Sequence, residues 1–379
     1  MKKILTIVGA RPQFIKAAAL SRVIAAYYSD DIQEFILHTG QHYDANMSEV
    51  FFEELNIPKP DFQLPSMEEW NDQVRRQMID QVREVIQKIK PDVVIVYGDT
   101  HSTLIGAEAA AIEKIPLAHI EAGLRSFNLN MPEEYNRVKT DQIAQFLYVP
   151  TKTGIENLKK EGIISTTKGS DESKTRFVVH TGDIMYDNAL YYGEVAHSYE
   201  SILSDLQLKK EEYLLATIHR NFNTDSIKRL KSIFKGLIEI AREIKVVLPL
   251  HPRTAKAIAN GFDDDLFDQI EDNHNLIIIE PLSFLEITCL EKNAKMIVTD
   301  SGGVQKEAYF YNKPSIILRS ETEWVEILRE KAAVLTDADP KKMINGFHQF
   351  KDWKHPHFPS IFGDGNAAFE IIDHLLANL

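Results

Sequence analysis

The sequence contains a single cysteine, Cys289, and it has no long apolar run. One cysteine cannot form an internal disulfide bond, which fits the reducing cytoplasm, and it leaves no thiolate cluster for structural zinc. Because no stretch of about 18 apolar residues is present, no membrane-spanning helix is expected. The apolar run at residues 4–8 is too short for the core of a signal peptide and is predicted to be a strand. We therefore expect a cytoplasmic protein without a membrane partner.

The sequence also has fewer positively than negatively charged residues. The 43 lysine and arginine residues are outnumbered by 56 aspartate and glutamate residues, which gives a net charge of −13. We expect no nucleic acid partner, although a local group of cations can still bind the phosphates of a nucleotide. The motifs G-x-G-x-x-G and G-x-x-x-x-G-K-[S/T] are both absent, so neither an ordinary dinucleotide fingerprint nor a P-loop is present.

What the chain does contain is a regular alternation of short apolar runs and helical stretches. Runs without alternating polarity predict strands buried on both faces, hence parallel sheets covered by helices. They lie at residues 4–8, 35–38, 93–97, 117–120, 146–149, 177–180, 213–218, 246–250, 276–279, 296–299, 315–318 and 332–335. A chain of 379 residues favours two domains. We predict an α/β protein of two doubly wound Rossmann-like domains facing across a ligand cleft.

The predicted domains comprise residues 1–182 and 183–364, and a final helix at residues 365–379 is expected to pack back on the first. Within the first domain, the strand at 93–97 leads to Asp99 and the strand at 117–120 leads to Glu121. Ligands bind at the carboxyl ends of strands in open α/β sheets. If these strands are neighbours, the two carboxylates raise each other's pKa, which suits a general acid or base. Asp99 could alternatively cap the helix that follows it.

A helix is predicted to begin at Pro132, a favourable first helical residue. Glu133 and Glu134 then occupy its first turn, and Arg137 follows one turn later. Acids in that turn stabilise the helix dipole, and Glu133 with Arg137 could form a surface ion pair. The same residues could instead belong to a site at the mouth between strand and helix.

In the second domain, Ser301-Gly302-Gly303 follows a predicted strand and opens a helix. Exposed N–H groups and the helix dipole favour an anion there, although a purely structural turn is the alternative. Basic residues gather in four clusters, three of them just beyond strand ends. They include Arg11, Lys16, His219, Arg220, His251 and Arg253.

Together these motifs resemble the non-hydrolysing UDP-N-acetylglucosamine 2-epimerase family over nearly the whole chain. The motifs are Gly9-Ala10-Arg11-Pro12 with Lys16, Thr39-Gly40-Gln41-His42, Gly98-Asp99-Thr100, His119-Ile120-Glu121-Ala122-Gly123-Leu124-Arg125, Pro132-Glu133-Glu134 with Asn136-Arg137, His219-Arg220, Thr299-Asp300-Ser301-Gly302-Gly303 with Glu307, and Gly363-Asp364-Gly365. The resemblance implies a fold of the glycosyltransferase-B type, a UDP-sugar held between the domains and a homodimer active in polysaccharide biosynthesis. It implies no metal and no nicotinamide cofactor.

The implied reaction inverts C2 of the sugar through anti elimination of UDP, an enzyme-bound 2-acetamidoglucal and syn re-addition of UDP. By resemblance, Asp99, Glu121 and Glu133 are the catalytic carboxylates, and which of them takes the C2 proton stays open. The resemblance makes His219 a further catalytic residue, which would neutralise the diphosphate together with Arg11, Lys16 and the turn of Ser301, Gly302 and Gly303. It assigns Arg137 to substrate binding and Glu307 to the ribose hydroxyls. Gln41, His42, Arg220 and His251 are candidates for a regulatory or second site.

Some segments depart from the better-known members of that family. Gln13-Phe14, Asp44-Ala45-Asn46-Met47 and Glu323-Trp324-Val325-Glu326 look more like the branch that acts on UDP-2,3-diacetamido-2,3-dideoxyglucuronate. Both sugars therefore stay open as substrates. A glycosyltransferase of the same architecture is an alternative, but it needs an acceptor site and only one base, whereas the density of carboxylates favours proton chemistry. A hydrolysing relative and a non-catalytic sensor are further alternatives.

Overall fold

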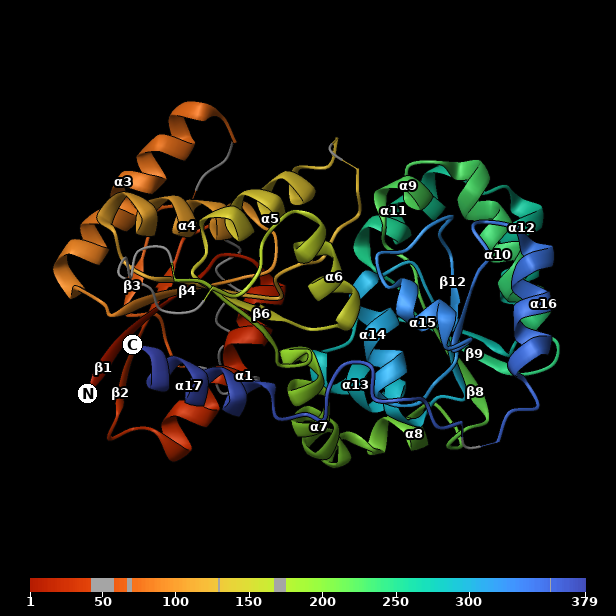
Figure 1. The fold of residues 1–379 in the computed structure, drawn as a ribbon. Helices are drawn as coiled ribbons and strands as arrows, with labels where there is room; N and C mark the ends of the chain where they lie inside the picture. The colour runs from red at the N-terminus through yellow and green to blue at the C-terminus, as the bar shows by residue number, and fades with distance from the viewer. Residues whose placement is uncertain (42–57, 67–69, 129, 167–174, 355) are drawn as a thin grey trace. The chain divides into compact units, whose positions relative to one another are not determined.

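The computed structural model describes residues 1–41, 58–66, 70–128, 130–166, 175–354 and 356–379. The chain forms two compact units, one of Met1–Asn188 with Ser360–Leu379 and one of Ala189–Pro359. Each unit contains a parallel sheet with helices on both faces, which confirms the predicted fold class (Figure 1). The ligand cleft that the sequence places between the domains stays a prediction.

The first unit has a sheet of seven strands among the described residues, in the order β3-β2-β1-β4-β5-β6-β7. The strands are β1 (Lys2–Val8), β2 (Ile32–His38), β3 (Phe62–Gln63), β4 (Val93–Tyr97), β5 (Leu117–Ile120), β6 (Phe146–Val149) and β7 (Phe177–His180). The strand order reverses between β1 and β4, which makes their carboxyl ends a switch point where ligands bind in such sheets. The two-residue strand β3 was not predicted, because so short an edge strand carries no apolar pattern.

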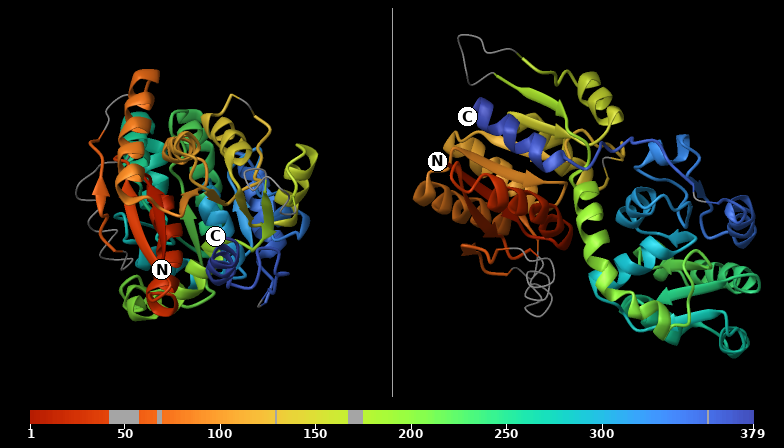
Figure 2. Two further views of the ribbon diagram at one scale, coloured as in Figure 1. Left: turned by 60° about the vertical axis from the view of Figure 1, so that its left-hand side comes forward. Right: turned by 90° about the horizontal axis from the view of Figure 1, so that it is seen from below.

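Helices cover both faces of this sheet (Figures 1 and 2). One face carries α3 (Asp72–Ile89), α4 (His101–Glu113), α5 (Pro132–Ile143) and α6 (Lys152–Lys160), and the other carries α1 (Arg11–Tyr27) and α17 (Ala367–Asn378). The last helix, α17, packs on α1, where Tyr28 donates a 2.7 Å hydrogen bond to Asp373. The C-terminal segment thus completes the first unit.

The chain passes from the first unit to the second within α7 (Ile184–Val195). The sequence placed this boundary at residue 182, whereas the compact units divide after Asn188. The reason lies in Asn188, whose side-chain amide donates a 2.6 Å hydrogen bond to the carbonyl of Ile15 in α1. The N-terminal part of α7, as far as Asn188, is therefore bonded to the first unit.

The second unit has six described strands in the order β10-β9-β8-β11-β12-β13. They are β8 (Tyr213–Thr217), β9 (Lys245–Pro249), β10 (Leu276–Ile279), β11 (Met296–Thr299), β12 (Ser315–Ile317) and β13 (Ala333–Leu335). On one face lie α10 (Ile227–Ala241), α11 (Pro252–Gly261), α12 (Asp264–Glu271) and α16 (Pro340–Phe350). On the other lie α8 (Ser201–Asp205), α13 (Phe284–Asn293) and α14 (Gly302–Phe310). The order reverses between β8 and β11.

None of the helices described in the structure has the length and apolar character needed to cross a membrane.

Candidate active site

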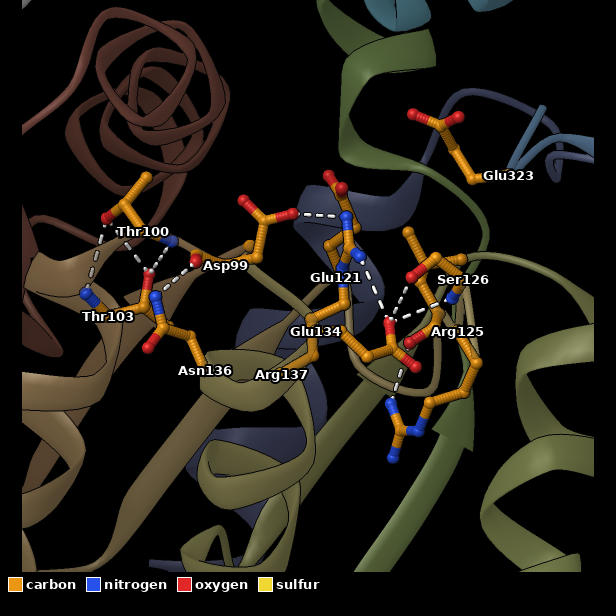
Figure 3. Close-up of polar contacts among 12 residues, drawn as sticks. Asp99, Thr100, Thr103, Glu121, Arg125, Ser126, Glu134, Asn136, Arg137 and Glu323 are labelled. Carbon is orange, nitrogen blue, oxygen red and sulfur yellow. Dashed lines mark hydrogen bonds and ion pairs between the residues drawn. The ribbon is translucent and has the colours of Figure 1, made fainter. Parts of the chain in front are cut away.

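Two carboxylates lie at the carboxyl ends of neighbouring strands in the first unit. β4 and β5 pair in parallel with Tyr97 opposite Ile120, so the residues that follow these strands, Asp99 and Glu121, leave the same edge of the sheet. The Glu121 carboxylate forms an ion pair with the Lys16 ammonium group. The Asp99 carboxylate forms one with the Arg137 guanidinium group (Figure 3). The carboxyl ends of β4 and β5, next to the switch point, thus hold two acids, each beside a cation.

Asp99 does not cap the helix that follows it. The N-cap of α4 is Thr100, whose hydroxyl accepts a 3.4 Å hydrogen bond from the backbone N–H of Thr103. The capping interpretation of Asp99 is therefore wrong, since the neighbouring residue fills that role. The backbone carbonyl of Asp99 is fixed separately by the Asn136 amide, at 2.8 Å.

The surroundings of Asp99 favour its protonated form. Burial raises the pKa of this carboxyl above its usual value, and the charges of Glu121 and Glu133 add to the rise, although Arg137 and Lys16 oppose it. A raised pKa brings a carboxyl group closer to the pH at which it can act as a general acid or base.

Glu121 is held in an unusual backbone conformation. Its φ angle is 73°, in the left-handed region that residues other than glycine rarely adopt. The backbone N–H groups of Glu121 and Ala122 both donate to the carbonyl of Tyr148, at 3.1 and 3.0 Å. These bonds to β6 hold the turn, and backbone strain of this kind is typical of functional sites.

Lys16 reaches the site because the turn between β1 and α1 is tied to the end of β4. The Gln13 side chain accepts hydrogen bonds from the N–H groups of Gly9 and Ala10, at 2.9 and 3.1 Å, and donates one to the carbonyl of Tyr97 at 2.9 Å. Lys16 itself is only 7 % exposed. The sequence singled out Gln13 only as a mark of one family branch, and only the structure gives it this positioning role.

The helix α5 begins at Pro132, as predicted, with Glu133 and Glu134 in its first turn. Glu133 is exposed, and its role in catalysis stays a prediction. Arg137 is buried at 9 % exposure, so the interpretation as a surface ion pair is wrong for this residue. Its guanidinium group contacts Asp99 and Glu134.

A buried network that the sequence did not predict joins the two strand ends. The ring of His119 lies 2.7 Å from the Asp141 carboxylate through Nδ1 and 2.7 Å from the carbonyl of Gly98 through Nε2. Asp141 also accepts from the N–H of Gly123 at 3.1 Å and pairs with Arg125 at 2.7 Å. Although burial acts to raise it, His119 and Arg125 hold the pKa of Asp141 below its usual range. Asp141 thereby holds the backbone after Glu121 directly, at Gly123, and the backbone before Asp99 through His119, at Gly98.

Two other predicted site residues, Arg11 and Gln41, follow the carboxyl ends of β1 and β2. Arg11 is exposed at the start of α1, and Gln41 accepts hydrogen bonds from the N–H and hydroxyl groups of Ser102 at 3.0 and 2.6 Å. His42 and the segment 44–47 lie outside the described residues. A regulatory role for Gln41 and His42 stays a prediction.

In the second unit, Asp300 organises the loop after β8. Its fully buried carboxylate accepts from the backbone N–H groups of His219 and Arg220, each at 3.1 Å, and from the Asn223 amide at 3.1 Å. His219 is thereby fixed while its side chain stays 38 % exposed, and its ring lies 5.6 Å from that of His251. The sequence placed Asp300 in the motif but did not foresee this role.

The turn Ser301-Gly302-Gly303, which the sequence predicts to bind an anion, lies at the N-terminus of α14. Ser301 is the N-cap of α14 and accepts from the N–H of Val304 at 3.5 Å. A side chain at Gly302 would meet the Glu323 carboxylate at 2.8 Å, while Gly303 is exposed. Glu323 in turn pairs with Arg319 at 2.8 Å. The turn therefore leaves its backbone open at Gly303 and places a carboxylate beside Gly302.

Glu307 lies half-buried on α14 beside an unforeseen acid of α13. Glu291 is 2 % exposed, and burial, with the nearby charge of Glu307, raises the pKa of Glu291 well above its usual value. The protonated form of Glu291 is therefore favoured. No group of three or more histidine, cysteine, aspartate or glutamate side chains suited to a metal ion was found in the described part of the chain.

The segment that departs from the family pattern packs against α14. Thr322 donates a 2.6 Å hydrogen bond to Gln305, and the Lys306 ammonium group lies 4.3 Å from the centre of the Trp324 ring. Lys306 and Trp324 are each 4 % exposed. The segment that differs from the family pattern therefore packs against the helix that begins at the Ser301-Gly302-Gly303 turn.

A cavity of about 820 Å³ lies away from these residues, at the amino ends of strands in the first sheet. Its lining includes Asp92, Pro116 and Gln145, which precede β4, β5 and β6. None of the predicted site residues lines it.

The sequence and the fold are similar to those of known proteins along nearly the whole chain. A family described as UDP-N-acetylglucosamine 2-epimerase matches residues 26–376. The UDP-2,3-diacetamido-2,3-dideoxy-D-glucuronate 2-epimerase of Pseudomonas aeruginosa is 43 % identical over 98 % of this chain and 99 % of its own. The UDP-N-acetylglucosamine 2-epimerase of Methanocaldococcus jannaschii is 39 % identical over 98 % of both chains. A crystal structure of that enzyme with UDP-GlcNAc and UDP has a TM-score of 0.82 and 37 % identity, with 99 % of both chains covered. The chain belongs to the UDP-N-acetylglucosamine 2-epimerase family.

Proposed function

We propose that this protein is a non-hydrolysing UDP-sugar 2-epimerase, an isomerase that inverts C2 of the sugar through anti elimination of UDP and syn re-addition. The observation that carries the proposal is the pair of carboxylates, Asp99 and Glu121, at the ends of neighbouring strands and each beside a cation. Removing and returning a proton at one carbon requires acid and base groups of this kind.

In the proposed reaction a carboxylate takes the C2 proton while the bond from C1 to the UDP oxygen breaks, which leaves a double bond between C1 and C2. UDP then adds back to C1, and a proton is delivered to the opposite face of C2. Asp99, Glu121 and Glu133 are the candidate groups. The raised pKa of Asp99 suits it to hold a proton, and Glu121 lies beside the Lys16 ammonium group.

The departing UDP carries negative charge that must be stabilised, and preorganised charge is usually the largest catalytic contribution. In the second unit we assign this role to His219 and to the N–H groups at Ser301, Gly302 and Gly303, where the start of α14 favours an anion. In the first unit we assign it to Arg11 and Lys16. Glu307 is proposed to bind the ribose hydroxyls.

His219→Ala is expected to weaken UDP binding roughly tenfold or more, because a hydrogen bond to a charged group contributes about 1.5–3 kcal/mol. Isothermal titration calorimetry with UDP measures the change. His274→Ala is the matched control, since His274 is exposed just before β10, at the other end of the strands. Unchanged UDP affinity in His219→Ala would remove His219 from the phosphate site.

UDP-N-acetylglucosamine is the substrate to test first, because relatives that bear its name span the whole chain. UDP-2,3-diacetamido-2,3-dideoxyglucuronate is the second candidate. It is favoured by the relative at 43 % identity and by the segment Glu323-Trp324-Val325-Glu326, which resembles that branch of the family.

Nuclear magnetic resonance of each UDP-sugar with the protein in deuterated water tests the function. We expect deuterium at C2 and the appearance of the C2 epimer without any acceptor. A glycosyltransferase would leave the C2 proton in place, and a hydrolysing relative would release free sugar and accumulate UDP.

We also propose that the enzyme is a cytoplasmic homodimer that supplies polysaccharide biosynthesis. Light scattering after size-exclusion chromatography tests the dimer, and a monomeric mass would contradict it.

A further inference from the structure

Glu134 is a buried acid next to the exposed Glu133. Both lie in the first turn of α5, where acids commonly face solvent and stabilise the helix dipole. Glu134 is only 1 % exposed. A buried carboxylate is costly unless it is hydrogen-bonded or paired, so its contacts indicate its role.

The Glu134 carboxylate holds the turn that follows Arg125. It accepts hydrogen bonds from the N–H and the hydroxyl group of Ser126, at 2.8 and 3.0 Å, and from the N–H of Phe127 at 3.0 Å. Phe127 has a φ angle of 58° and is 72 % exposed. A bulky residue in this left-handed conformation is strained, and burial of its side chain does not compensate for the strain. The bonds to Glu134 therefore keep the turn in place.

The same carboxylate also touches the cation that faces Asp99. Arg137 approaches Glu134 through Nη1 at 3.3 Å and contacts Asp99 through Nη2. Figure 3 shows this chain of contacts from Ser126 through Glu134 and Arg137 to Asp99. A negative charge beside the guanidinium group weakens the positive field that reaches Asp99.

We infer that Glu134 is a positioning residue for the carboxylate site, because it fixes the Ser126–Phe127 turn and, through Arg137, sets the charge that Asp99 experiences. This inference rests on the proposed function, which gives Asp99 a part in proton transfer. It assigns Glu134 no contact with the substrate.

The inference predicts a direction for the pH dependence. The charged groups that act on Asp99 are Arg137 and Glu133 from α5, Lys16 from α1 and Glu121 after β5. Removing the charge of Glu134 leaves Arg137 more positive towards Asp99, which favours the ionised carboxylate and lowers the pKa of Asp99. Asp99 ionisation sets one limb of the profile of activity against pH. This limb must then move to lower pH, whether Asp99 acts as acid or as base.

Glu134→Gln is the decisive variant, since it keeps an acceptor oxygen for the turn and loses the charge. We expect its limb to move down by about half a pH unit or more. The melting temperature should fall as well, because both carboxylate oxygens accept hydrogen bonds from the turn and the amide keeps only one acceptor oxygen. Glu134→Asp keeps the charge with a shorter reach, so we expect the limb to stay while the turn is held less tightly and the melting temperature falls. Glu113→Gln, which removes a carboxylate paired with Arg83 at 2.7 Å in the same unit, is the control and should change neither.

A second readout does not depend on turnover. The carbon-13 signal of the Asp99 carboxyl group, assigned with Asp99→Asn, should titrate at lower pH in Glu134→Gln than in the wild type. Equal titration in the two proteins, or a shifted limb in Glu134→Asp, would overturn the inference. Absence of C2 exchange in the wild type would overturn only the proposed function, because the carboxyl titration still tests Glu134.

Discussion

Glu121→Gln is expected to abolish turnover, with a fall of about 10²–10⁴-fold, the range that general acid–base groups contribute. The substitution keeps the shape of the side chain but removes the charge that pairs with Lys16 and the ability to accept a proton. UDP binding should change little, because the proposal assigns Glu121 to proton transfer. The rate of C2 deuterium exchange and the affinity for UDP measure the two effects separately.

Glu211→Gln is the matched control for this variant. Glu211 also pairs with a largely buried lysine, Lys313, at 3.3 Å, but lies in the second unit just before β8. It should retain full exchange. Full turnover in Glu121→Gln itself would take Glu121 out of the mechanism, and a large loss of UDP affinity would assign it to binding instead.

Asp141→Asn is expected to lower the free energy of unfolding of the first unit by about 3–5 kcal/mol, the usual effect of breaking a buried ion pair from one side. The variant leaves the guanidinium group of Arg125 and the ring of His119 beside a neutral amide, with both side chains almost fully buried. Hydrogen exchange of peptides from β4 and β5 measures the loss. Activity should fall as well, because Asp141 fixes the turn at Gly123, two residues after Glu121.

This loss should depend on pH in a defined direction. The pKa of Asp141 is held below its usual range, so its stabilising contribution is present above the unfolded value of about 4 and is lost as pH falls through the folded value. The difference between wild type and variant should therefore shrink on strong acidification. Asp80→Asn removes an exposed partner of Arg83 and should cost less than about 1 kcal/mol. A similarly small effect in Asp141→Asn would show that the network adds little stability.

The strands of both sheets could be predicted from the sequence because their signal is local. A strand buried on both faces reads as a short apolar run, and β4, β5, β6, β7, β10 and β11 begin and end where such runs do. The two-residue β3 and the side-chain contacts of the segment from Thr322 to Trp324 have no comparable pattern, so only the structure revealed them.

For the site, the sequence by itself determined which chemical groups stand at the strand ends: Asp99, Glu121, the basic residues and the glycine turn before α14. Only the tertiary structure decided that Arg137 meets Asp99, that Lys16 meets Glu121, and that Asp141 and Glu134 hold the surrounding turns. The physical reason is that residue type and periodicity act over a few neighbouring residues. Ion pairs between distant segments depend instead on strand order, register and helix packing, which long-range contacts set.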